Sequence, residues 1–375
     1  MFCSPRVFYC RCLLQRLQND QKRVAGLHNT KVSTLGTSNK YEPNRRHQGS
    51  PVMALPPPVP EFILRGSGAP VNTLHFRCGD PGPPLLFSGS GKGAIHVWNL
   101  TTRRAEKVLE GHGGASVIWL DTLGSRDTLI SQGRDMRVCT WDLSEGRSDV
   151  LDSFSTGSVG FCQCSLLQSP GLSLLAHPGP LTEEIKLIDL ASKTQVCSLK
   201  SDAKRGMLMC AKLWQPDSGT GPLLLTGHED GWLSLWDVSQ RRPLSGLAAH
   251  PEPVMCLDFD PAGGRGVSGS SERALASWTL DGQQSLQLQE SVEVVNPGFS
   301  QLRVRQDCRI LATAGWDHRV RLFGWKRLRP LAVLRHHGDA ALCVAFSDHG
   351  DPRRRVLAAG SKDQRISVWS VYSDA

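Results

Sequence analysis

Short runs of alternating apolar and polar residues recur along most of the chain, and nearly every run ends at an aromatic residue. In the segment from Leu86 to Trp98, small residues lead to a polar turn, and the alternating pair Ile95 and Val97 follows. Alternation with a period of two predicts a β-strand that buries one face. Gly, Asp and Lys between the runs are typical of hairpin turns. The pattern therefore predicts successive hairpins.

These segments recur at a nearly constant spacing. A degenerate copy ends at Ile188, and the six clear copies end at Trp98, Trp141, Trp236, Trp278, Phe323 and Trp369. Successive ends are 42 to 48 residues apart, close to the roughly 40–45 residues of a four-stranded propeller blade. One blade cannot bury both of its faces alone, so the blades must stack around an axis. Seven copies predict an all-β, seven-bladed propeller.

The two ends of the repeat region predict how the ring closes. Only six residues follow Trp369, too few for the fourth strand of the last blade. The apolar stretch from Phe62 to Arg65 stands before the first repeat, where a fourth strand is expected. We expect this N-terminal strand to complete the last blade and to remove an exposed sheet edge.

The first 61 residues differ from the rest. Residues 1–52 carry nine Lys or Arg against Asp20 and Glu42, and a proline run covers 56–60. Such a run is stiff and extended. We predict a disordered, basic and proline-rich extension over 1–61, followed by the propeller over 62–375. Two alternatives remain open: Met53 is the true start, or the stretch, rich in Arg and poor in acids, is a mitochondrial targeting segment.

Charge and cysteine usage narrow the class of protein. Beyond residue 52 the chain holds 34 basic and 33 acidic residues, whereas a nucleic-acid-binding domain shows a basic patch. No apolar run approaches the ~18 residues of a membrane span. Most of the 12 Cys lie in apolar runs, and without a secretory signal we expect reduced thiols in the cytoplasm or nucleus. Cys162 and Cys164 lack a second ligand pair at zinc-site spacing, so we expect no metal and no cofactor.

The repeats resemble the WD-repeat family over about residues 62–371. The resemblance implies a hydrogen-bonded set of four in each blade: a His after Gly, a Ser or Thr, a turn acid and a Trp. The implied members are His112, Ser131, Asp135 and Trp141 in the second repeat; Asp230 and Trp236 in the fourth; His250, Ser268, Glu272 and Trp278 in the fifth; Asp317 in the sixth; and His337, Asp363 and Trp369 in the seventh.

Several repeats depart from this set. Lys92 stands at the turn position of the first repeat, and Ala359 replaces the hydroxyl of the seventh. The fourth and sixth repeats have Thr226 and Thr313 but no matching His. We expect these blades to depend more on apolar packing.

None of these sets predicts catalysis. His112, Ser131 and Asp135 have the residue types of a hydrolase triad, but a triad needs an exposed nucleophile and an oxyanion hole. A buried carboxylate with a His and a hydroxyl as partners is the structural interpretation, and the types recur blade after blade. We therefore predict no catalytic residues.

In four repeats the residue before the turn acid is a candidate for partner binding, whereas the fifth repeat has Ser271 there. These positions hold Arg134, Glu229, Trp316 and Lys362, and the turns should all lie on one rim of the ring. Exposed aromatic and Arg side chains are common hot spots of protein interfaces. The hypothesis is a protein-docking face; the alternative, that Trp316 packs over a neighbouring blade, stays open.

The resemblance implies a non-enzymatic, monomeric scaffold that binds other proteins. It also relates the chain to a propeller subunit of the assembly that helps large phosphatidylinositol-3-kinase-like kinases mature with chaperones. The alternative is a G-protein beta-like signalling subunit, for which residues 1–52 lack the heptad pattern of an N-terminal helix. An enzyme would need His or acids on the channel strands, whereas the acids noted here lie in turns.

Overall fold

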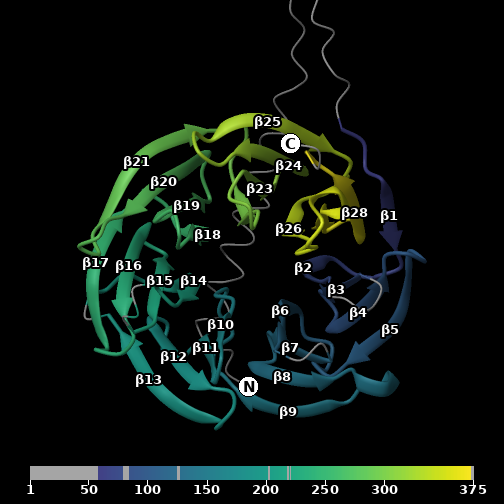
Figure 1. Cartoon of the computed structure of the whole chain (residues 1–375), viewed down its shortest axis with the longest axis horizontal. Helices are drawn as coiled ribbons and strands as arrows, with labels where there is room; N and C mark the ends of the chain where they lie inside the picture. Colours follow the sequence, from purple (N-terminus) through teal and green to yellow (C-terminus); the bar gives the residue numbers. More distant parts are fainter. Residues whose placement is uncertain are drawn as a thin grey trace, which may run out of the picture. The chain divides into compact units, whose positions relative to one another are not determined.

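Seven four-stranded antiparallel sheets surround a common axis (Figure 1). This computed structural model describes residues 58–78, 84–124, 127–201, 203–217, 219 and 221–372. The predicted all-β, seven-bladed fold is confirmed. The expected disordered extension lies, up to residue 57, outside the described residues, and the division of the chain at residue 61 stays a prediction.

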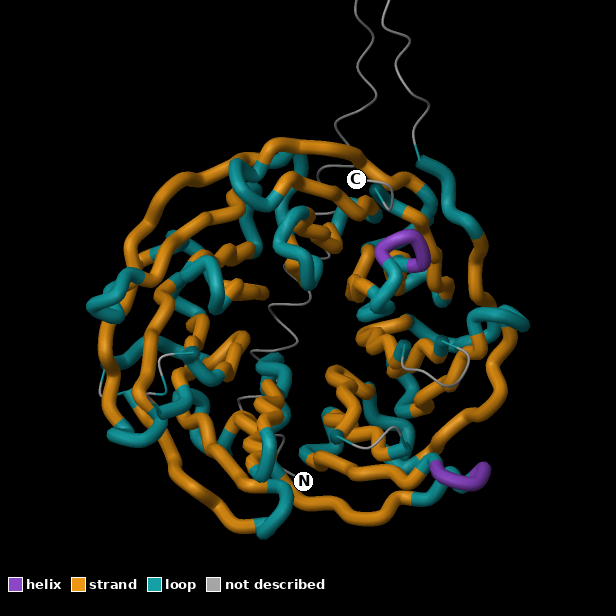
Figure 2. Tube along the Cα trace, viewed as in Figure 1, coloured by secondary structure: helices purple, strands orange, loops and turns teal. Residues whose placement is uncertain are grey.

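Each blade runs from an inner strand to an outer strand in chain order, and Figure 2 shows that strands make up most of the ring. The first four blades are β2 (Val71–Arg77), β3 (Leu85–Ser90), β4 (Ala94–Asn99) and β5 (Arg104–Glu110); β6 (Val117–Leu123), β7 (Thr128–Gly133), β8 (Arg137–Asp142) and β9 (Val150–Ser155); β10 (Ser165–Ser169), β11 (Leu172–Pro178), β12 (Glu184–Asp189) and β13 (Thr194–Lys200); and β14 (Leu208–Trp214), β15 (Leu223–His228), β16 (Trp232–Asp237) and β17 (Arg242–Ala248).

The remaining blades follow the same order, except that the last takes its outer strand from the start of the chain. They are β18 (Val254–Asp260), β19 (Arg265–Ser270), β20 (Ala274–Leu280) and β21 (Leu286–Glu293); β22 (Phe299–Val304), β23 (Ile310–Gly315), β24 (Arg319–Gly324) and β25 (Arg329–Arg335); and β26 (Ala341–Phe346), β27 (Val356–Ser361), β28 (Arg365–Ser370) and β1 (Phe62–Arg65). Two 3₁₀ turns, η2 (Ser144–Gly146) and η3 (Pro352–Arg354), lie in connections.

The ring closes as the sequence predicts. β1 pairs antiparallel with β28, and Phe62 stands opposite Val368 while Leu64 stands opposite Ile366. Leu64 is buried in the apolar cluster between the seventh and first blades. The first described strand and the last strand of the chain therefore hold one sheet together.

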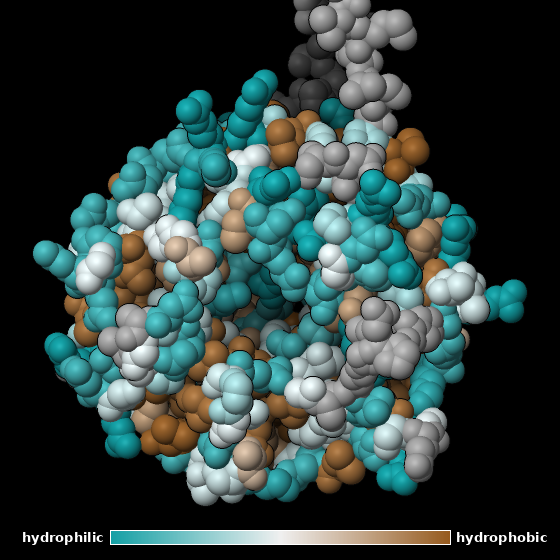
Figure 3. Space-filling model, viewed as in Figure 1, coloured by the Kyte–Doolittle hydropathy of each residue, from teal (hydrophilic) through white to brown (hydrophobic). Residues whose placement is uncertain are grey.

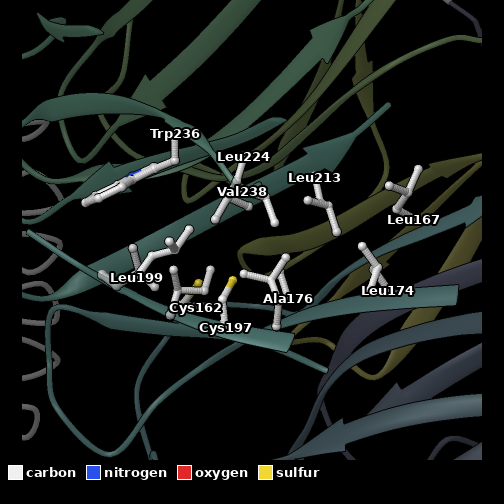
Figure 4. Close-up of a cluster of buried hydrophobic side chains, with 13 residues drawn as sticks. Cys162, Leu167, Leu174, Ala176, Cys197, Leu199, Leu213, Leu224, Trp236 and Val238 are labelled. Carbon is white, nitrogen blue, oxygen red and sulfur yellow. The ribbon is translucent and has the colours of Figure 1, made fainter. Parts of the chain in front are cut away.

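The core consists of apolar layers between neighbouring blades. In the described part of the chain each of the seven blade interfaces has its own buried cluster. Between the third and fourth blades, Leu213 and Trp236 pack toward Cys197 and Leu199 (Figure 4). Because every blade is covered on both faces, the stacking expected for repeats is realised.

Glycines in the second strands let the blades approach. A Cβ on Gly89 would lie 2.7 Å from Val117 of the next blade, and a Cβ on Gly360 would lie 2.6 Å from Val71. The seam between the second and third blades differs, because Gln132 stands at this position. Its side chain donates to the Cys162 carbonyl and accepts from the Cys164 amide.

Antiparallel order gives the ring two distinct faces. The turns between the second and third strands lie at the same end as the connections from one blade to the next, and we call this end face A. Face B, the opposite end, carries the connections between first and second strands and between third and fourth strands.

Candidate functional site

The second blade contains a complete four-residue network. Nδ1 of His112, from the connection before β6, lies 3.0 Å from both carboxylate oxygens of Asp135 in the turn after β7. Nε2 of the same ring lies 2.8 Å from the Ser131 hydroxyl, and the Trp141 indole N–H donates to that hydroxyl at 2.7 Å. The network ties an inter-blade connection to the middle of the sheet.

The protonation of this network follows from burial. Burial lowers the pKa of His112, and the Asp135 carboxylate opposes this only in part. With a neutral ring, Nδ1–H donates to Asp135 and Nε2 accepts from the hydroxyl of Ser131. Ser131 is fully buried, so its hydroxyl cannot reach a substrate. The arrangement is structural.

The seventh blade builds the same network from a different strand. Nδ1 of His337 lies 3.1 Å from Asp363, and Nε2 lies 2.8 Å from the hydroxyl of Ser367 on β28. The Trp369 indole donates to the same hydroxyl at 2.8 Å. The inference that Ala359 leaves this blade without a hydroxyl is therefore wrong.

The fourth blade recruits a His that the repeat register does not predict. Nε2 of His228, two residues beyond Thr226 on β15, lies 3.0 Å from the Thr226 hydroxyl, which also accepts from the Trp236 indole at 3.0 Å. Asp230 is exposed and pairs with Arg205 at 3.3 Å. The expected absence of a His is thus incorrect, although Asp230 stays outside the network.

The fifth blade forms only half of the expected set. Nε2 of His250 lies 2.9 Å from the Ser268 hydroxyl. Glu272 is exposed, and the Trp278 indole nitrogen is buried without a partner in the described structure. The placement of Glu272 and Trp278 in this network is therefore wrong, because the side chain at the turn faces solvent.

The sixth blade replaces imidazole with guanidinium. Arg321 on β24 donates from Nη1 to Oδ1 of Asp317 at 3.0 Å, and the Asn296 amide donates to Oδ2 at 2.8 Å. Burial alone raises the pKa of Asp317, but the hydrogen bonds from Arg321 and Asn296 outweigh it and leave the pKa lowered. The turn acid is thus an anion with charged and amide donors.

The turn acids also have a local role. Oδ1 of Asp135 accepts from the Arg137 amide at 3.2 Å, and Asp363 accepts from the Arg365 amide at 3.0 Å. The residue between each such pair has a positive φ, 64° at Met136 and 67° at Gln364. An Asp side chain that bonds the backbone two residues on stabilises such a turn, so these carboxylates hold the connections of face A in shape.

The four hypothesised docking residues lie in separate turns of face A. The Arg134 guanidinium stands 4.8 Å from the Phe161 ring, and Glu229 accepts from the Met207 amide at 3.0 Å. Lys362 is exposed and lies 3.8 Å from Asp339. The structure does not gather these side chains into one cluster.

Trp316 is half-buried over the connection that enters its own blade. Its backbone N–H donates to the Gly298 carbonyl at 3.1 Å, and a Cβ on Gly298 would overlap the indole. The open alternative placed this indole over a neighbouring blade, whereas the Gly298 contact lies within the sixth-blade unit.

Face A also exposes apolar side chains that the sequence analysis did not single out. Met136 (40%), Val159 (50%), Leu181 (47%) and Val295 (75%) are the exposed large apolar residues in the strand connections that the structure describes, and all four lie on face A. A Cβ on Gly157 would lie 3.2 Å from Pro180, so the loops that carry Val159 and Leu181 are adjacent.

The axial channel carries polar groups on the inner strands. A cavity of about 500 Å³ lies there and is lined by His75, Asp121, Lys212 and Arg303 among others. Asp258 on β18 is buried beside Lys212 at 2.8 Å. The statement that acids occur only in turns is therefore wrong, because Asp121 and Asp258 belong to inner strands.

The described residues contain no group of three or more His, Cys, Asp or Glu side chains arranged to hold a metal ion. Burial raises the pKa of the Cys162 and Cys256 thiols to about 12, so these buried cysteines are protonated and unreactive. In that same part of the chain, no helix has the length and apolar character needed to cross a bilayer.

Comparison with known proteins places the chain among repeat proteins of this kind. The family model described as "WD domain, G-beta repeat" matches residues 328–370. The guanine nucleotide-binding protein subunit beta-like protein 1 of Mus musculus is 52% identical over 322 residues, which cover 84% of this chain and 97% of that protein.

More distant relatives share a second name. ASTRA-associated protein 1 of Aspergillus flavus is 27% identical over 86% of this chain and 100% of its own length. ASTRA-associated protein 1 of Schizosaccharomyces pombe is 25% identical over 84% of this chain and 99% of its length. The similarity thus extends over the whole propeller rather than over single repeats.

Proposed function

Because this chain belongs to the WD-repeat family of guanine nucleotide-binding protein subunit beta-like protein 1, we propose that it is a non-enzymatic scaffold. Its partners are other proteins. The relatives named ASTRA-associated protein 1 support a role in a comparable assembly, in which the propeller helps chaperones to mature phosphatidylinositol-3-kinase-like kinases. The proposal includes a monomeric propeller in the cytoplasm or nucleus that binds no nucleic acid.

The observation that carries a docking role is the uneven placement of apolar loop residues. Met136, Val159, Leu181 and Val295 are exposed on face A. Val159 and Leu181 stand in adjacent loops, and exposed apolar residues that lie together on one surface mark protein interfaces. Arg134 and Trp316 add the residue types enriched in interface hot spots, so face A is the proposed docking face.

The absence of catalysis is part of the proposal. The His, Ser and acid sets of the second and seventh blades both have fully buried hydroxyls, at Ser131 and Ser367. In the channel, Nε2 of His75 lies 3.1 Å from the Thr122 hydroxyl and 3.7 Å from the Asp121 carboxylate. Both groups face the same ring nitrogen, whereas a triad needs the acid on the other nitrogen of the imidazole.

Affinity purification from cells tests the docking face. A Val159→Asp, Leu181→Asp variant of the full chain should lose at least about tenfold of its co-purifying chaperone and kinase subunits, because two charges enter an apolar interface. Leu151→Asp, on the outer strand β9 and 60% exposed, is the matched control. Equal recovery with both variants, each folded by circular dichroism, would contradict the proposal.

The same purification distinguishes the proposed scaffold from the alternative function. Forms 1–375 and 53–375 are compared, since residues 1–52 hold most of the net charge. Recovery of a G-protein gamma subunit in place of chaperone and kinase subunits would favour the G-protein beta-like signalling subunit.

A further inference from the structure

The inner strands form a ring of matched positions near face B. In every blade, the inner-strand residue that pairs with the position just before the Ser131 equivalent of the second strand belongs to this ring. Its members are His75, Asp121, Ser165, Lys212, Asp258, Arg303 and Ala345. We call them the channel ring. The charged members are distributed unequally around the axis.

Three adjacent blades contribute a cationic wall. Nζ of Lys212 lies 2.8 Å from Oδ1 of Asp258, and the Val304 amide donates to Oδ2 at 2.9 Å. Burial raises the pKa of Asp258, but the charges of Lys212 and Arg303 outweigh burial and lower it. The carboxylate is therefore an anion between two cations, and one positive charge is in excess.

Arg303 carries this excess positive charge and has more N–H donors than it uses in hydrogen bonds. Nη1 donates to the Leu302 carbonyl at 3.3 Å, whereas a guanidinium has five N–H donors. Among the described residues no carboxylate lies within ion-pair distance of it, although Arg321 and Arg305 of the same blade each have an acid partner. The Ser300 hydroxyl, which also lines the cavity, is buried without a hydrogen-bond partner in that same set.

The opposite wall of the cavity is acidic. Asp121 lies there beside His75, 3.7 Å away, and Asp348 lines the same cavity. A polyanion filling the cavity would bring several charges against these carboxylates. A ligand with a single carboxylate matches the excess charge at Arg303 and leaves the acidic wall undisturbed.

A contact across the axis narrows the channel on its face A side. Nε2 of Gln301 lies 3.4 Å from Oε1 of Gln163, so the sixth and third blades, which are not neighbours, are in contact across the axis. This contact lies on the face A side of the channel ring, because Gln301 precedes Arg303 on β22. Figure 3 shows that the centre of the ring is hollowed.

We propose that the axial cavity binds one carboxylate of a peptide, held by Arg303 and Lys212 and reached from face B. About 500 Å³ falls within the range of small-ligand sites and admits an acidic side chain with its neighbours. The guanidinium offers the bidentate geometry that carboxylates prefer. This site lies at the other end of the ring from the proposed docking face.

Side-chain NMR of the ¹⁵N-labelled full chain tests the site directly. The Arg303 Nε–H signal is assigned by its loss in Arg303→Gln, and Arg329→Gln, an exposed position on the outer strand of the same blade, is the control. Acetyl-Ala-Glu-Ala-amide should shift this signal saturably, at least about tenfold more tightly than acetyl-Ala-Gln-Ala-amide, because the neutral amide loses the charge-assisted bond.

Two further probes define the source and the class of ligand. Acetyl-Ala-Ala-Ala with a free carboxyl terminus tests whether a chain end serves as well as a side chain. Inositol hexakisphosphate should bind more weakly than the Glu peptide. Three results would each overturn the proposal: an unchanged Arg303 signal, equal shifts with the Glu and Gln peptides, or tighter binding of inositol hexakisphosphate. The docking role of face A is tested separately, by the Val159→Asp, Leu181→Asp variant.

Discussion

The Ser367 hydroxyl lies 2.8 Å from Nε2 of His337. In the second blade the equivalent hydroxyl belongs to Ser131 on β7, the position that Ala359 occupies on β27. Ala359 and Ser367 are direct cross-strand partners. The hydroxyl has therefore moved to the opposite residue of the neighbouring strand and still reaches the same His.

Removal of this hydroxyl should be costly. We predict that Ser367→Ala lowers the free energy of unfolding by about 1–3 kcal/mol, because His337 and the Trp369 indole both lose a buried partner. Adding Ala359→Ser should restore part of the loss, since that position carries the hydroxyl in other blades. Urea unfolding measures both. No loss in the single variant, or no recovery in the double variant, would contradict this account.

The sixth-blade ion pair should show strong coupling. Arg321→Met is expected to lower the unfolding free energy by about 3–5 kcal/mol, because Asp317 becomes a buried charge without its main partner. Asp317→Asn combined with Arg321→Met should cost less than Arg321→Met alone, as the charge is then gone. A double-mutant cycle measures the coupling; simple additivity would show that the pair is not a unit.

Stability should fall on mild acidification. Burial lowers the pKa of both His228 and His250 to about 4, against roughly 6.5 in the unfolded chain. The unfolded state then takes up protons first, so stability is complete above pH ~6.5 and is lost as the pH falls toward 4. From pH 7 to pH 5 each His should cost about 2 kcal/mol.

Urea unfolding at the two pH values checks this dependence. His250→Gln should remove the part of the pH-dependent loss in unfolding free energy that His250 contributes, about 2 kcal/mol, although the variant is less stable at pH 7. A free energy of unfolding that is equal at pH 7 and pH 5 would disprove the neutral state inferred for these rings.

The glycines at the contacts between neighbouring blades should not tolerate even an added methyl group. In Gly360→Ala the new Cβ would lie 2.6 Å from Val71 Cγ1 and 2.7 Å from the Cys343 sulfur, and we expect a loss of about 1–3 kcal/mol from overpacking. Gly282→Ala is the control, because no atom lies within 4 Å of its Cβ position. Differential scanning calorimetry compares the two; equal melting temperatures would show that the seam adapts.

Blade number and ring closure were accessible from the sequence because they depend on spacing. The anchors from Trp98 to Trp369 mark each third strand, and the short tail after Trp369 requires an outer strand from elsewhere. Both features depend on chain length and on alternation, which a sequence displays directly.

The networks were less accessible because they depend on which residues face each other. Thr313 stands opposite Arg321, as Ala359 stands opposite Ser367. Once the strands are paired, the two substitutions can be found by reading across the hairpin rather than along the chain. Glu272 could not be excluded in this way, since the direction of a turn side chain is not encoded by register.

The channel ring was missed for another reason. Inner strands such as β18 appear as apolar runs, so Asp258 between Leu257 and Phe259 resembles an interruption rather than a member of a set. Its meaning depends on Lys212 and Arg303, each about 45 residues away and on a neighbouring blade. Comparing the same strand position in all seven repeats would have revealed the set.

The pairing of β1 with β28 has a consequence for biosynthesis. The strand at Phe62 leaves the ribosome about 300 residues before its partner at Val368 is made, an interval of roughly 15–60 s at ordinary translation rates. Throughout that interval Phe62, Ile63 and Leu64 lack their final cover. A truncation that removes either strand damages the same joint, and a nascent chain can complete its ring only once both strands have emerged.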